Sequence, residues 1–377
     1  MLSLLNKNWC QAEPPSVTVS QLERGLKIPK PVAVLLANRG VTSEESAREF
    51  LSSDLSRLHD PFLMADMRQA VDRVIKAMEQ KEAITLFCDY DVDGVTSAAF
   101  LTHFFRDLNY PVEAYLPERK AEGYGLNSDA VRKIRAQGAG LMITADCGIT
   151  GVKEVALANE IGLDVIVTDH HQVGGEGLPP AVAVLNPHRS DCEYPYRFLC
   201  GVGLAFKLAI AVRNELYSAG WSKEDLPNLK RHLDLFALGT IADVAPLTGE
   251  NHILTQHGLK MLSITSKPGL VALKETAGIV GNVDARSVGF GLGPRLNAAG
   301  RLGRADNGLH LLASQNLKEA KALALELDQT NQERKEIQEE TVAEAESLFK
   351  RHINLEEDRV IVLASEIFHP GVIGIAA

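Results

Sequence analysis

The chain has 377 residues and an ordinary globular composition, which is enough for two domains with substantial cores. It has no apolar run long enough to span a bilayer, and its N-terminus does not have the pattern of a secretory signal. Its five cysteines include no CxxC pair, which favours a reducing cytoplasm over a disulfide scaffold or a zinc knuckle. The net charge of −10 disfavours a generic polyanion binder, although bound divalent cations would offset part of the carboxylate charge.

Two helical segments are predicted near the N-terminus, at residues 29–40 and 42–51, and the second has Thr42 or Ser43 as its N-cap. Strands and helices then alternate. The predicted strands are residues 83–89, 112–117, 141–147, 164–170 and 181–187. The predicted helices between them are residues 94–108, 127–138 and 150–162. Alternation with short, glycine-marked joints indicates an α/β fold with a doubly wound parallel sheet.

The C-terminal half is predicted to be mainly helical, at residues 200–216, 231–244, 250–262 and 317–352. A glycine-rich segment, residues 288–308, is expected to interrupt these helices. The last and longest helix is highly charged and has no Gly or Pro, which favours a solvated helix connecting two lobes over a coiled-coil dimer. Residues 359–365 predict a strand that begins a second α/β lobe, and the apolar, glycine-rich ending predicts that the chain stops inside that lobe.

Three carboxylates, Asp89, Asp91 and Asp93, occupy alternate positions where the first strand ends. Alternate side chains of an extended chain share a face, so their charges repel unless protons or cations intervene. Acidic or imidazole side chains also follow the third and fourth predicted strands, and another acid closes a predicted helix: Asp146, Asp169, His170, His171 and Asp243. Ligands of open parallel sheets gather at the carboxyl ends of the strands, so the sequence predicts a catalytic metal site rather than scattered surface charge.

The sequence DYDVDG also matches the opening of an EF-hand calcium loop. That loop requires a glutamate at its twelfth position, where this chain has Phe100, and a predicted strand precedes the loop, so the EF-hand interpretation fails. Carboxylates with imidazoles and without thiolates favour Mn²⁺ or Mg²⁺. Two ions sharing a carboxylate would suit phosphoester hydrolysis, and Gly94 is expected to let the chain turn into a helix whose free N–H groups bind phosphate.

The segment GPRLNAAGRLGR predicts a second phosphate contact, because arginine side chains lie among glycines that permit close approach. The candidate residues are Arg295, Asn297, Arg301 and Arg304. The alternative is a glycine-rich contact between helices with solvated arginines. The segment PERKAEGYGLN is a weaker candidate, in which Arg119 and Lys120 offer charge and Tyr124 a stacking face.

Five motifs, taken in their order along the chain, resemble those of the DHH phosphoesterase superfamily, and within it those of the RecJ-type exonucleases specific for single-stranded DNA. These motifs are DYDVDG, ADCG, the triplet Asp169–His171, GTIADVAPL and GPRLNAAGRLG. The resemblance runs from about Met64 to Ala377. It implies one metal at Asp91 and Asp146, and a second at Asp93, Asp146, His170 and Asp243. The triplet then contributes Asp169 and His171 as catalytic residues, with His171 near the scissile phosphate.

One position departs from the pattern of the superfamily. Many relatives have a histidine two residues before the first aspartate of the first motif, where this chain has Phe87. Asp89 is expected to serve as an additional ligand there, or else the metal at Asp91 binds more weakly.

The resemblance implies a metal-dependent enzyme that degrades single-stranded DNA from its 5′ end to mononucleotides in repair and recombination. The alternatives are a DHH phosphoesterase acting on short oligonucleotides or small or cyclic nucleotides, and a non-catalytic replication scaffold. Expected partners are single-stranded DNA, a single-strand-binding protein and a RecQ-type helicase, with a monomeric, cytoplasmic enzyme and no membrane association. The predicted organisation is a helical lead-in (1–62), a DHH catalytic domain (63–315), a connecting helix (316–352) and the start of a DHH-associated nucleic-acid-binding domain (353–377).

Overall fold

The computed structural model describes residues 10, 12–302, 305–355 and 357–376. Its centre is a parallel sheet with the strand order β2-β1-β3-β4-β5. The strands are β1 (Ala83–Cys88), β2 (Val112–Tyr115), β3 (Ala139–Ala145), β4 (Asp164–Thr168) and β5 (Ala183–Leu185). All of the strands predicted between residues 83 and 187 are therefore confirmed, as is the doubly wound parallel sheet.

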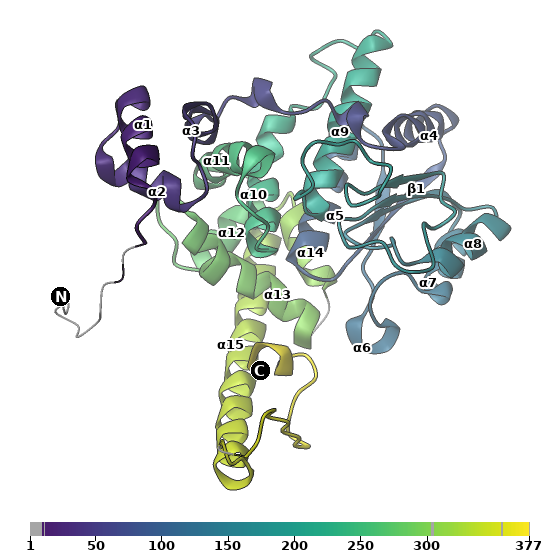
Figure 1. Cartoon of the computed structure of the whole chain (residues 1–377). Helices are drawn as coiled ribbons and strands as arrows, with labels where there is room; N and C mark the ends of the chain where they lie inside the picture. Colours follow the sequence, from purple (N-terminus) through teal and green to yellow (C-terminus); the bar gives the residue numbers. More distant parts are fainter. Residues whose placement is uncertain (1–9, 11, 303–304, 356, 377) are drawn as a thin grey trace.

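Helices cover both faces of this sheet, and for that reason the strands are apolar almost throughout rather than alternating with polar residues. One face packs against α4 (Met67–Gln80), α5 (Val92–Asp107) and α9 (Gly201–Ser218). The other face packs against α7 (Ser128–Ala136) and α8 (Val152–Glu160), as Figure 1 shows at the right of the molecule. Successive residues of β1 point into the two separate cores: Leu86 and Cys88 into one, Phe87 into the other.

A helical body continues the first of these cores beyond α5 and α9. Its elements are η3 (Leu229–His232), α10 (Leu233–Ala242), α11 (Gly249–Ile264), α12 (Pro268–Thr276), η4 (Ser287–Leu292), α13 (Gly293–Leu302) and α14 (Asp306–Ala313). The glycine-rich segment 288–308 does not interrupt the helices as predicted. Up to residue 302 it forms a π-helix that continues into α13, because its small residues pack closely against neighbouring elements rather than forming a loop.

The longest helix, α15 (Leu317–His352), has the bounds that its charged, Gly- and Pro-free sequence predicts. Asn316 caps it, accepting hydrogen bonds from the N–H groups of Lys318 and Glu319. Its first half packs on α12, α13 and α14, and the rest extends away from the body, as both views show. No described helix has the length and apolar character that crossing a lipid bilayer requires.

The predicted strand at residues 359–365 is wrong: this segment has no regular structure, and Val360 and Val362 are largely exposed. A strand is stable only when a neighbour satisfies its backbone groups, and none of the described strands lies beside this segment. The chain instead turns back along α15 and ends in the short helix α16 (Ile373–Ala376).

The N-terminal segment has a small core of its own. It comprises α1 (Ser16–Leu26), which the sequence reading missed, α2 (Lys30–Asn38) and α3 (Glu44–Leu51), with Ser43 as the cap of α3. The short turns η1 (Leu55–Arg57) and η2 (Pro61–Leu63) lead on to the sheet domain, and α6 (Arg119–Glu122) follows β2.

Candidate metal centre

The site lies where the order of the sheet reverses. From β1 the chain crosses to β2 on one side and then to β3 on the other, so β1 and β3 are neighbours with diverging connections. Parallel sheets of this kind hold their ligands outside the carboxyl ends of the strands at this switch point. Asp89 follows β1 directly and Asp146 follows β3 directly, so both flank the switch point.

Asp91 is the N-cap of α5, and its Oδ1 accepts hydrogen bonds from the N–H groups of Asp93 and Gly94 at 2.8 and 3.1 Å. The N–H of Val92 donates to Oδ1 of Asn297 at 3.1 Å. The prediction that these N–H groups bind phosphate is therefore wrong, because side chains already satisfy them. Gly94 is required for a different reason: a Cβ there would lie 2.2 Å from the carbonyl oxygen of Asp89.

Asp93 points from the first turn of α5 into the N-terminus of α9. Its carboxylate accepts hydrogen bonds from the N–H of Gly201 at 2.5 Å and the N–H of Val202 at 2.9 Å. The N-cap of α9, Cys200, makes no side-chain cap of its own, so the Asp93 carboxylate takes the place of a capping group. Burial nevertheless raises the pKa of Asp93, which favours a proton or a cation beside it.

Asp146 lies between the other ligands with a left-handed backbone, φ 64°. Its Oδ1 is 3.0 Å from Nε2 of His170, and Gly201 packs against it so closely that a Cβ would lie 2.5 Å from the Cβ of Asp146. Burial and the neighbouring Asp93 raise the pKa of Asp146 well above its ordinary value. Strain and crowded negative charge of this kind are typical of functional sites.

Asp169 does not join the ligand clusters. Its Oδ2 accepts a hydrogen bond from the N–H of Ile149 at 2.8 Å, and its Oδ1 lies 2.7 Å from Nδ1 of His171. Burial opposes ionisation of Asp169, but the hydrogen bonds from His171 lower its pKa overall, and the same contact raises the pKa of His171. The pair therefore holds His171 in one orientation and favours its protonated form, with Nε2 lying 3.3 Å from the hydroxyl of Tyr124.

Potential ligand atoms gather in three overlapping groups, with the atoms of each group within 4.8 Å of one another. These groups are Asp89 with Asp91 and Asp146, Asp93 with His170 and Asp243, and Asp146 with His170 and His171. Asp243 reaches the site as the C-cap of α10. The structure thus brings together all the residues that the sequence named as ligands.

The donor set fits hard divalent cations. Oδ1 of Asp89 is buried and makes no hydrogen bond, and Oδ1 of Asp146 has His170 as its neighbour. Burial raises the pKa of Asp89 and of Asp243 to about 7, and neighbouring carboxylates add to both shifts. Oxygen and imidazole donors with uncompensated negative charge match Mn²⁺ or Mg²⁺, and the arrangement gives two groups of ligands on either side of Asp146.

Phe87 does not take part in this site. Its ring is fully buried on the face covered by α7 and α8, where it stacks on Tyr115 with a centroid separation of 5.6 Å. Asp89 instead provides the third member of the group formed with Asp91 and Asp146.

The arginine-rich segment reaches the site through α13. Gly300 packs against Tyr90, where a Cβ would lie 2.6 Å from the carbonyl oxygen, and Arg301 follows it. Burial and the nearby guanidinium groups of Arg119 and Arg334 lower the pKa of Arg301. Arg334 is a basic residue near Arg301 that the sequence did not predict, because nothing in the charged helix α15 distinguishes it from its neighbours.

The other candidates in this segment have different surroundings. Arg295 forms an ion pair with Asp328 of α15 at 2.8 Å and donates to the carbonyl oxygen of Gly291. Asn297 uses its Oδ1 to hold Val92 at the start of α5. Arg304 lies outside the described residues.

Asn186 is a buried residue of the site that the sequence reading did not identify. Its amide group donates to the carbonyl oxygen of His171 at 2.9 Å and accepts from the N–H of His188 at 2.7 Å. It follows β5 directly, so the same strand-end position that marks the aspartates could have revealed it.

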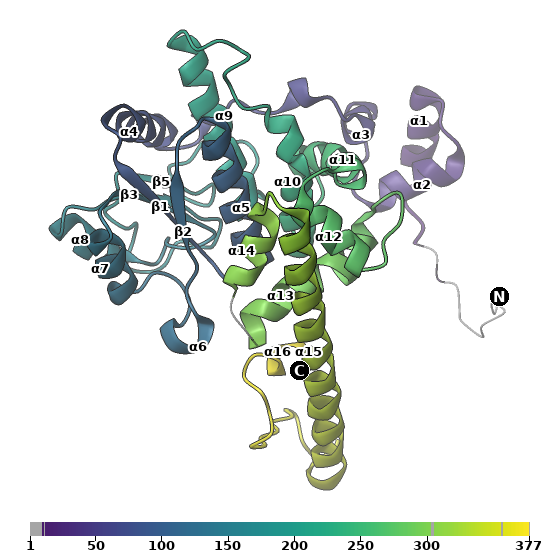
Figure 2. The same cartoon turned by 180° about the vertical axis from the view of Figure 1, so that it is seen from behind.

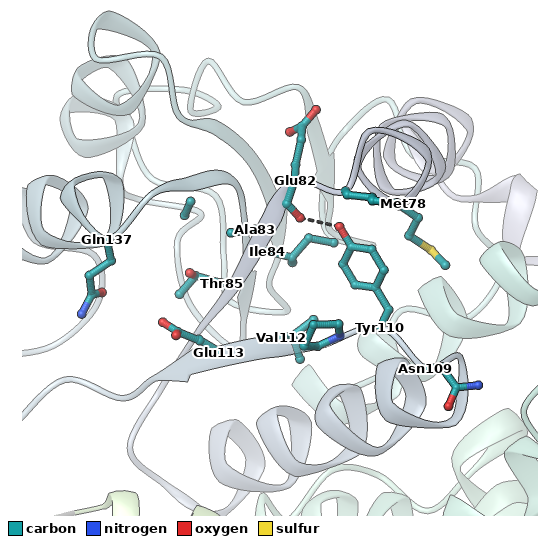
Figure 3. Close-up of a pocket in the computed structure, with 13 residues that line it drawn as sticks. Met78, Glu82, Ala83, Ile84, Thr85, Asn109, Tyr110, Val112, Glu113 and Gln137 are labelled. Carbon is teal, nitrogen blue, oxygen red and sulfur yellow. Dashed lines mark hydrogen bonds between the residues drawn. The ribbon is translucent and has the colours of Figure 1, made fainter.

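A cavity of about 570 Å³ lies at the amino-terminal edge of the sheet, opposite the edge at which the candidate metal ligands lie. Figure 3 shows Tyr110 beside it, with its hydroxyl group hydrogen-bonded to the carbonyl oxygen of Glu82. Its lining contains none of the site residues, so it does not contribute to the metal centre.

Comparison with known proteins shows the family to which the chain belongs. Residues 83–240 match the DHH family, N-terminal domain. The chain is 42% identical over 370 residues to the single-stranded-DNA-specific exonuclease RecJ of Bacillus subtilis, covering 98% of this chain and 45% of that protein. It is 39% identical over 366 residues to RecJ of Escherichia coli, covering 93% of this chain and 61% of that protein. The chain thus spans about half the length of the curated relatives it matches.

Solved structures agree with the sequence comparison. RecJ of Thermus thermophilus in complex with Mn²⁺ aligns with a TM-score of 0.79 at 32% identity, covering 97% of this chain and 50% of that one. A second structure, exonuclease RecJ bound to manganese, aligns with a TM-score of 0.74 at 36% identity, covering 86% of this chain and 78% of that one. The chain belongs to the RecJ family of DHH proteins.

Proposed function

We propose that this chain is the catalytic part of a metal-dependent exonuclease that hydrolyses single-stranded DNA from the 5′ end to mononucleotides. The observation that carries the proposal is the pair of ligand groups on either side of Asp146 at the switch point of the sheet. The exonuclease names of the relatives and the manganese-bound relatives support the same reading.

Asp89, Asp91 and Asp146 would hold one divalent cation, and Asp93, Asp146, His170 and Asp243 a second, which makes Asp146 the shared ligand. Cations in these positions would polarise the phosphoryl group and lower the pKa of an attacking water. Asp93 is fixed by two backbone N–H groups of α9, so its carboxylate needs little reorganisation.

His171 would act beside the scissile phosphate as an orienting group or general acid. Asp169 raises the pKa of His171, which favours a protonated imidazole that would deliver its proton from Nε2 to the leaving oxygen. Arg119 and Arg301 would bind phosphate oxygens. Asn297 would act by holding the first turn of α5, and Arg295 by joining α13 to α15 through Asp328.

The metal assignment is tested with Asp146→Asn, which keeps the size of the side chain but removes one charge from both ligand groups. We expect at least a 100-fold loss of Mn²⁺-dependent release of mononucleotides from a single strand, since an essential shared ligand is weakened. Asp72→Asn is the matched control, because Asp72 is exposed on α4. Full activity in Asp146→Asn would contradict the proposal.

Substrate class and polarity are tested with the unmodified protein. We expect hydrolysis of a long single strand to stop with EDTA or with a blocked 5′ end, and to continue with a blocked 3′ end. Turnover of a dinucleotide without turnover of the long strand would instead favour a phosphoesterase of short oligonucleotides. Absence of turnover combined with retained binding of single-stranded DNA would favour a scaffold.

The domain organisation, the monomeric state, the cytoplasmic location and the protein partners remain predictions. The separate core of α1–α3 supports an N-terminal unit, whose apolar contacts end at Phe50, whereas Leu55, Leu58 and Phe62 pack against the main core. Its link to the catalytic domain is polar: the N–H of His59 donates to Glu250, and its carbonyl oxygen accepts from Lys207.

A further inference from the structure

The triplet Asp169–His171 leads into a connection without regular structure. Residues 172–182, which join β4 to β5, form neither helix nor strand. Asp91, by contrast, caps α5, and Asp243 caps α10. Irregular segments are usually more mobile than the elements they connect, yet a catalytic group must be held to within about 0.5 Å. Other contacts must therefore fix the two imidazoles of the triplet.

The side chains of the triplet fix it on the side that faces β4. Oδ2 of Asp169 accepts a hydrogen bond from the N–H of Ile149, and Oδ1 lies 2.7 Å from Nδ1 of His171. Nε2 of His170 lies 3.0 Å from Oδ1 of Asp146. None of these contacts restrains the backbone after His171, where the chain leaves the site.

Asn186 provides a contact at that point. Its amide nitrogen donates to the carbonyl oxygen of His171 at 2.9 Å, and its Oδ1 accepts from the N–H of His188 at 2.7 Å. The side chain is fully buried. The second bond closes a turn of the Asx type, which a serine can also form, whereas the first bond needs a donor that reaches across to another loop.

Asn186 has a rigid support. It directly follows β5, and Figure 2 shows this strand beneath α4, against which it packs. The carbonyl oxygen of Leu185 accepts a hydrogen bond from the N–H of Asp169, so the ends of β4 and β5 lie in register beside the triplet. The buried guanidinium group of Arg189 binds Asp66 at the start of α4. The amide group of Asn186 is therefore held in place from two sides.

We propose that Asn186 is a positioning residue for both imidazoles of the triplet. By holding the carbonyl oxygen of His171, it fixes how His170 reaches its place in the metal centre and the direction in which Nε2 of His171 presents a proton. Because Asn186 is fully buried, it acts only through these two residues.

The inference rests on the proposed function. In that reaction the oxygen of a water bonds to phosphorus and the water loses a proton to the solvent. The bond from phosphorus to the 3′ oxygen of the first nucleotide breaks, and this oxygen takes the proton of His171. The position of Nε2 therefore affects the rate of the step in which the 3′ oxygen leaves.

The test compares Asn186→Ser with the unmodified protein. Serine keeps an acceptor for the N–H of His188 but is too short to donate to His171. We expect kcat for Mn²⁺-dependent hydrolysis of a single strand to fall on the order of 100-fold, as for a displacement of about 1 Å at a catalytic group, with KM unchanged. Asn186→Asp, which keeps the size and the acceptor but has no donor, should lose at least as much.

A change of leaving group separates positioning from a general loss of structure. A strand whose first linkage has sulfur in place of the 3′ oxygen releases a thiolate, which needs no proton because thiols are far more acidic than alcohols. A positioned acid contributes on the order of 100-fold, so the loss in Asn186→Ser should be at least about tenfold smaller on the sulfur strand than on the oxygen strand.

A second measurement concerns His170 and needs no substrate. Isothermal titration calorimetry should show that Mn²⁺ binds Asn186→Ser on the order of 10-fold more weakly than the unmodified protein, as expected when a group that orients a metal-binding histidine is removed.

Asn159→Ala is the matched control. The amide group of Asn159 donates to the carbonyl oxygen of Pro180 at 2.7 Å, so it also ties the connection from β4 to β5, but at a point away from the triplet. This variant should hydrolyse both strands and bind Mn²⁺ as the unmodified protein does. Equal losses in Asn159→Ala and Asn186→Ser would mean that loosening of the connection lowers activity, and the positioning role would be wrong.

The outcomes for Asn186 and for the proposed function are separable. If the unmodified protein hydrolyses the strand and Asn186→Ser does so with unchanged kcat and unchanged Mn²⁺ affinity, the positioning role is wrong and the proposed function stands. A loss that is equal on the oxygen and sulfur strands, with unchanged Mn²⁺ affinity, also contradicts the positioning role. If the unmodified protein hydrolyses neither strand, the proposed function fails, and the calorimetric comparison decides the role of Asn186.

Discussion

The carboxyl groups of Asp89 and Asp243 have pKa values of about 7, mainly because they are buried and secondly because other carboxylates surround them. Both values lie above the ordinary range near 4. The folded protein without metal therefore binds more protons than the unfolded chain between about pH 4 and pH 7. By linkage, these groups make the metal-free protein less stable as the pH rises through that window.

The direction of this pH dependence predicts how added metal changes the stability of the protein. Mn²⁺ must displace the protons on these carboxylates, so its affinity should fall about tenfold for each displaced proton and each pH unit below 7. We expect Mn²⁺ to raise the melting temperature clearly at pH 8 and only slightly at pH 5.5. Thermal unfolding with and without Mn²⁺ measures this, and Asp89→Asn should flatten the pH dependence. A stabilisation by Mn²⁺ that is independent of pH would contradict the assignment.

Gly201 is a second residue whose environment gives a specific prediction. Replacing it with alanine places a Cβ 2.5 Å from the Cβ of Asp146 and displaces a residue whose N–H binds Asp93. Shifts of about 1 Å at a catalytic group lower rates on the order of 100-fold. We expect a loss of that size in Mn²⁺-dependent turnover with an unchanged circular dichroism spectrum. Gly175→Ala, with open space around it, is the control.

At the scale of the element, the C-terminal end of α10 is strained. After the cap Asp243, the N–H of Val244 donates to the carbonyl oxygen of Ile241, and that of Ala245 to Thr240. This is a Schellman motif, which normally has glycine or asparagine in its left-handed position. Here the position is occupied by Val244, with φ 59° and a side chain that is 85% exposed.

Val244→Asn should therefore stabilise the protein by about 1 kcal/mol, because asparagine adopts the left-handed conformation at less cost and little packing is lost. Chemical denaturation measures the change. Val244→Ala serves as the comparison, since alanine keeps a Cβ in the same conformation and should recover less stability. A destabilised asparagine variant would show that the valine side chain makes a contact that outweighs the backbone strain.

At the scale of the whole molecule, a buried ion pair between α9 and α11 also holds His59 of the preceding segment by hydrogen bonds. Lys207 of α9 and Glu250 of α11 are 2.5 Å apart and almost completely buried. Glu250 also accepts hydrogen bonds from the hydroxyl of Tyr194 and the N–H of His59. Burial lowers the pKa of Lys207, and the neighbouring Glu250 opposes this shift.

Lys207→Met should destabilise the protein by about 3–5 kcal/mol, because it leaves Glu250 buried without a counter-charge. The double variant Lys207→Met/Glu250→Gln should recover part of this loss, since the uncompensated charge is then absent. Urea unfolding of both variants gives the comparison. Equal losses in the two variants would mean that packing, rather than charge, dominates at this position.

The sequence by itself determined what depends on local pattern. The apolar runs gave the strands of the sheet, and the absence of Gly and Pro gave the bounds of α15. The carboxylates at the strand ends gave the ligands, because parallel strands place their carboxyl ends at one edge whatever their order. The identity of Asp91 as a helix cap, by contrast, was not anticipated, since a carboxylate can cap a helix or bind a metal and the residue type suits both.

Only the tertiary structure decided which distant groups meet. The strand order placed β1 beside β3, and α9 brought Gly201 to Asp93 across 108 positions of the sequence. Arg295 forms an ion pair with Asp328, so its charge is compensated. Arg334 lies near Arg301, and no pattern in the sequence predicts this. The segment 359–365 has the composition of a strand but no described neighbour with which to pair. Hydrogen bonds and charges act through space, so pairings like these depend on packing that no local pattern contains.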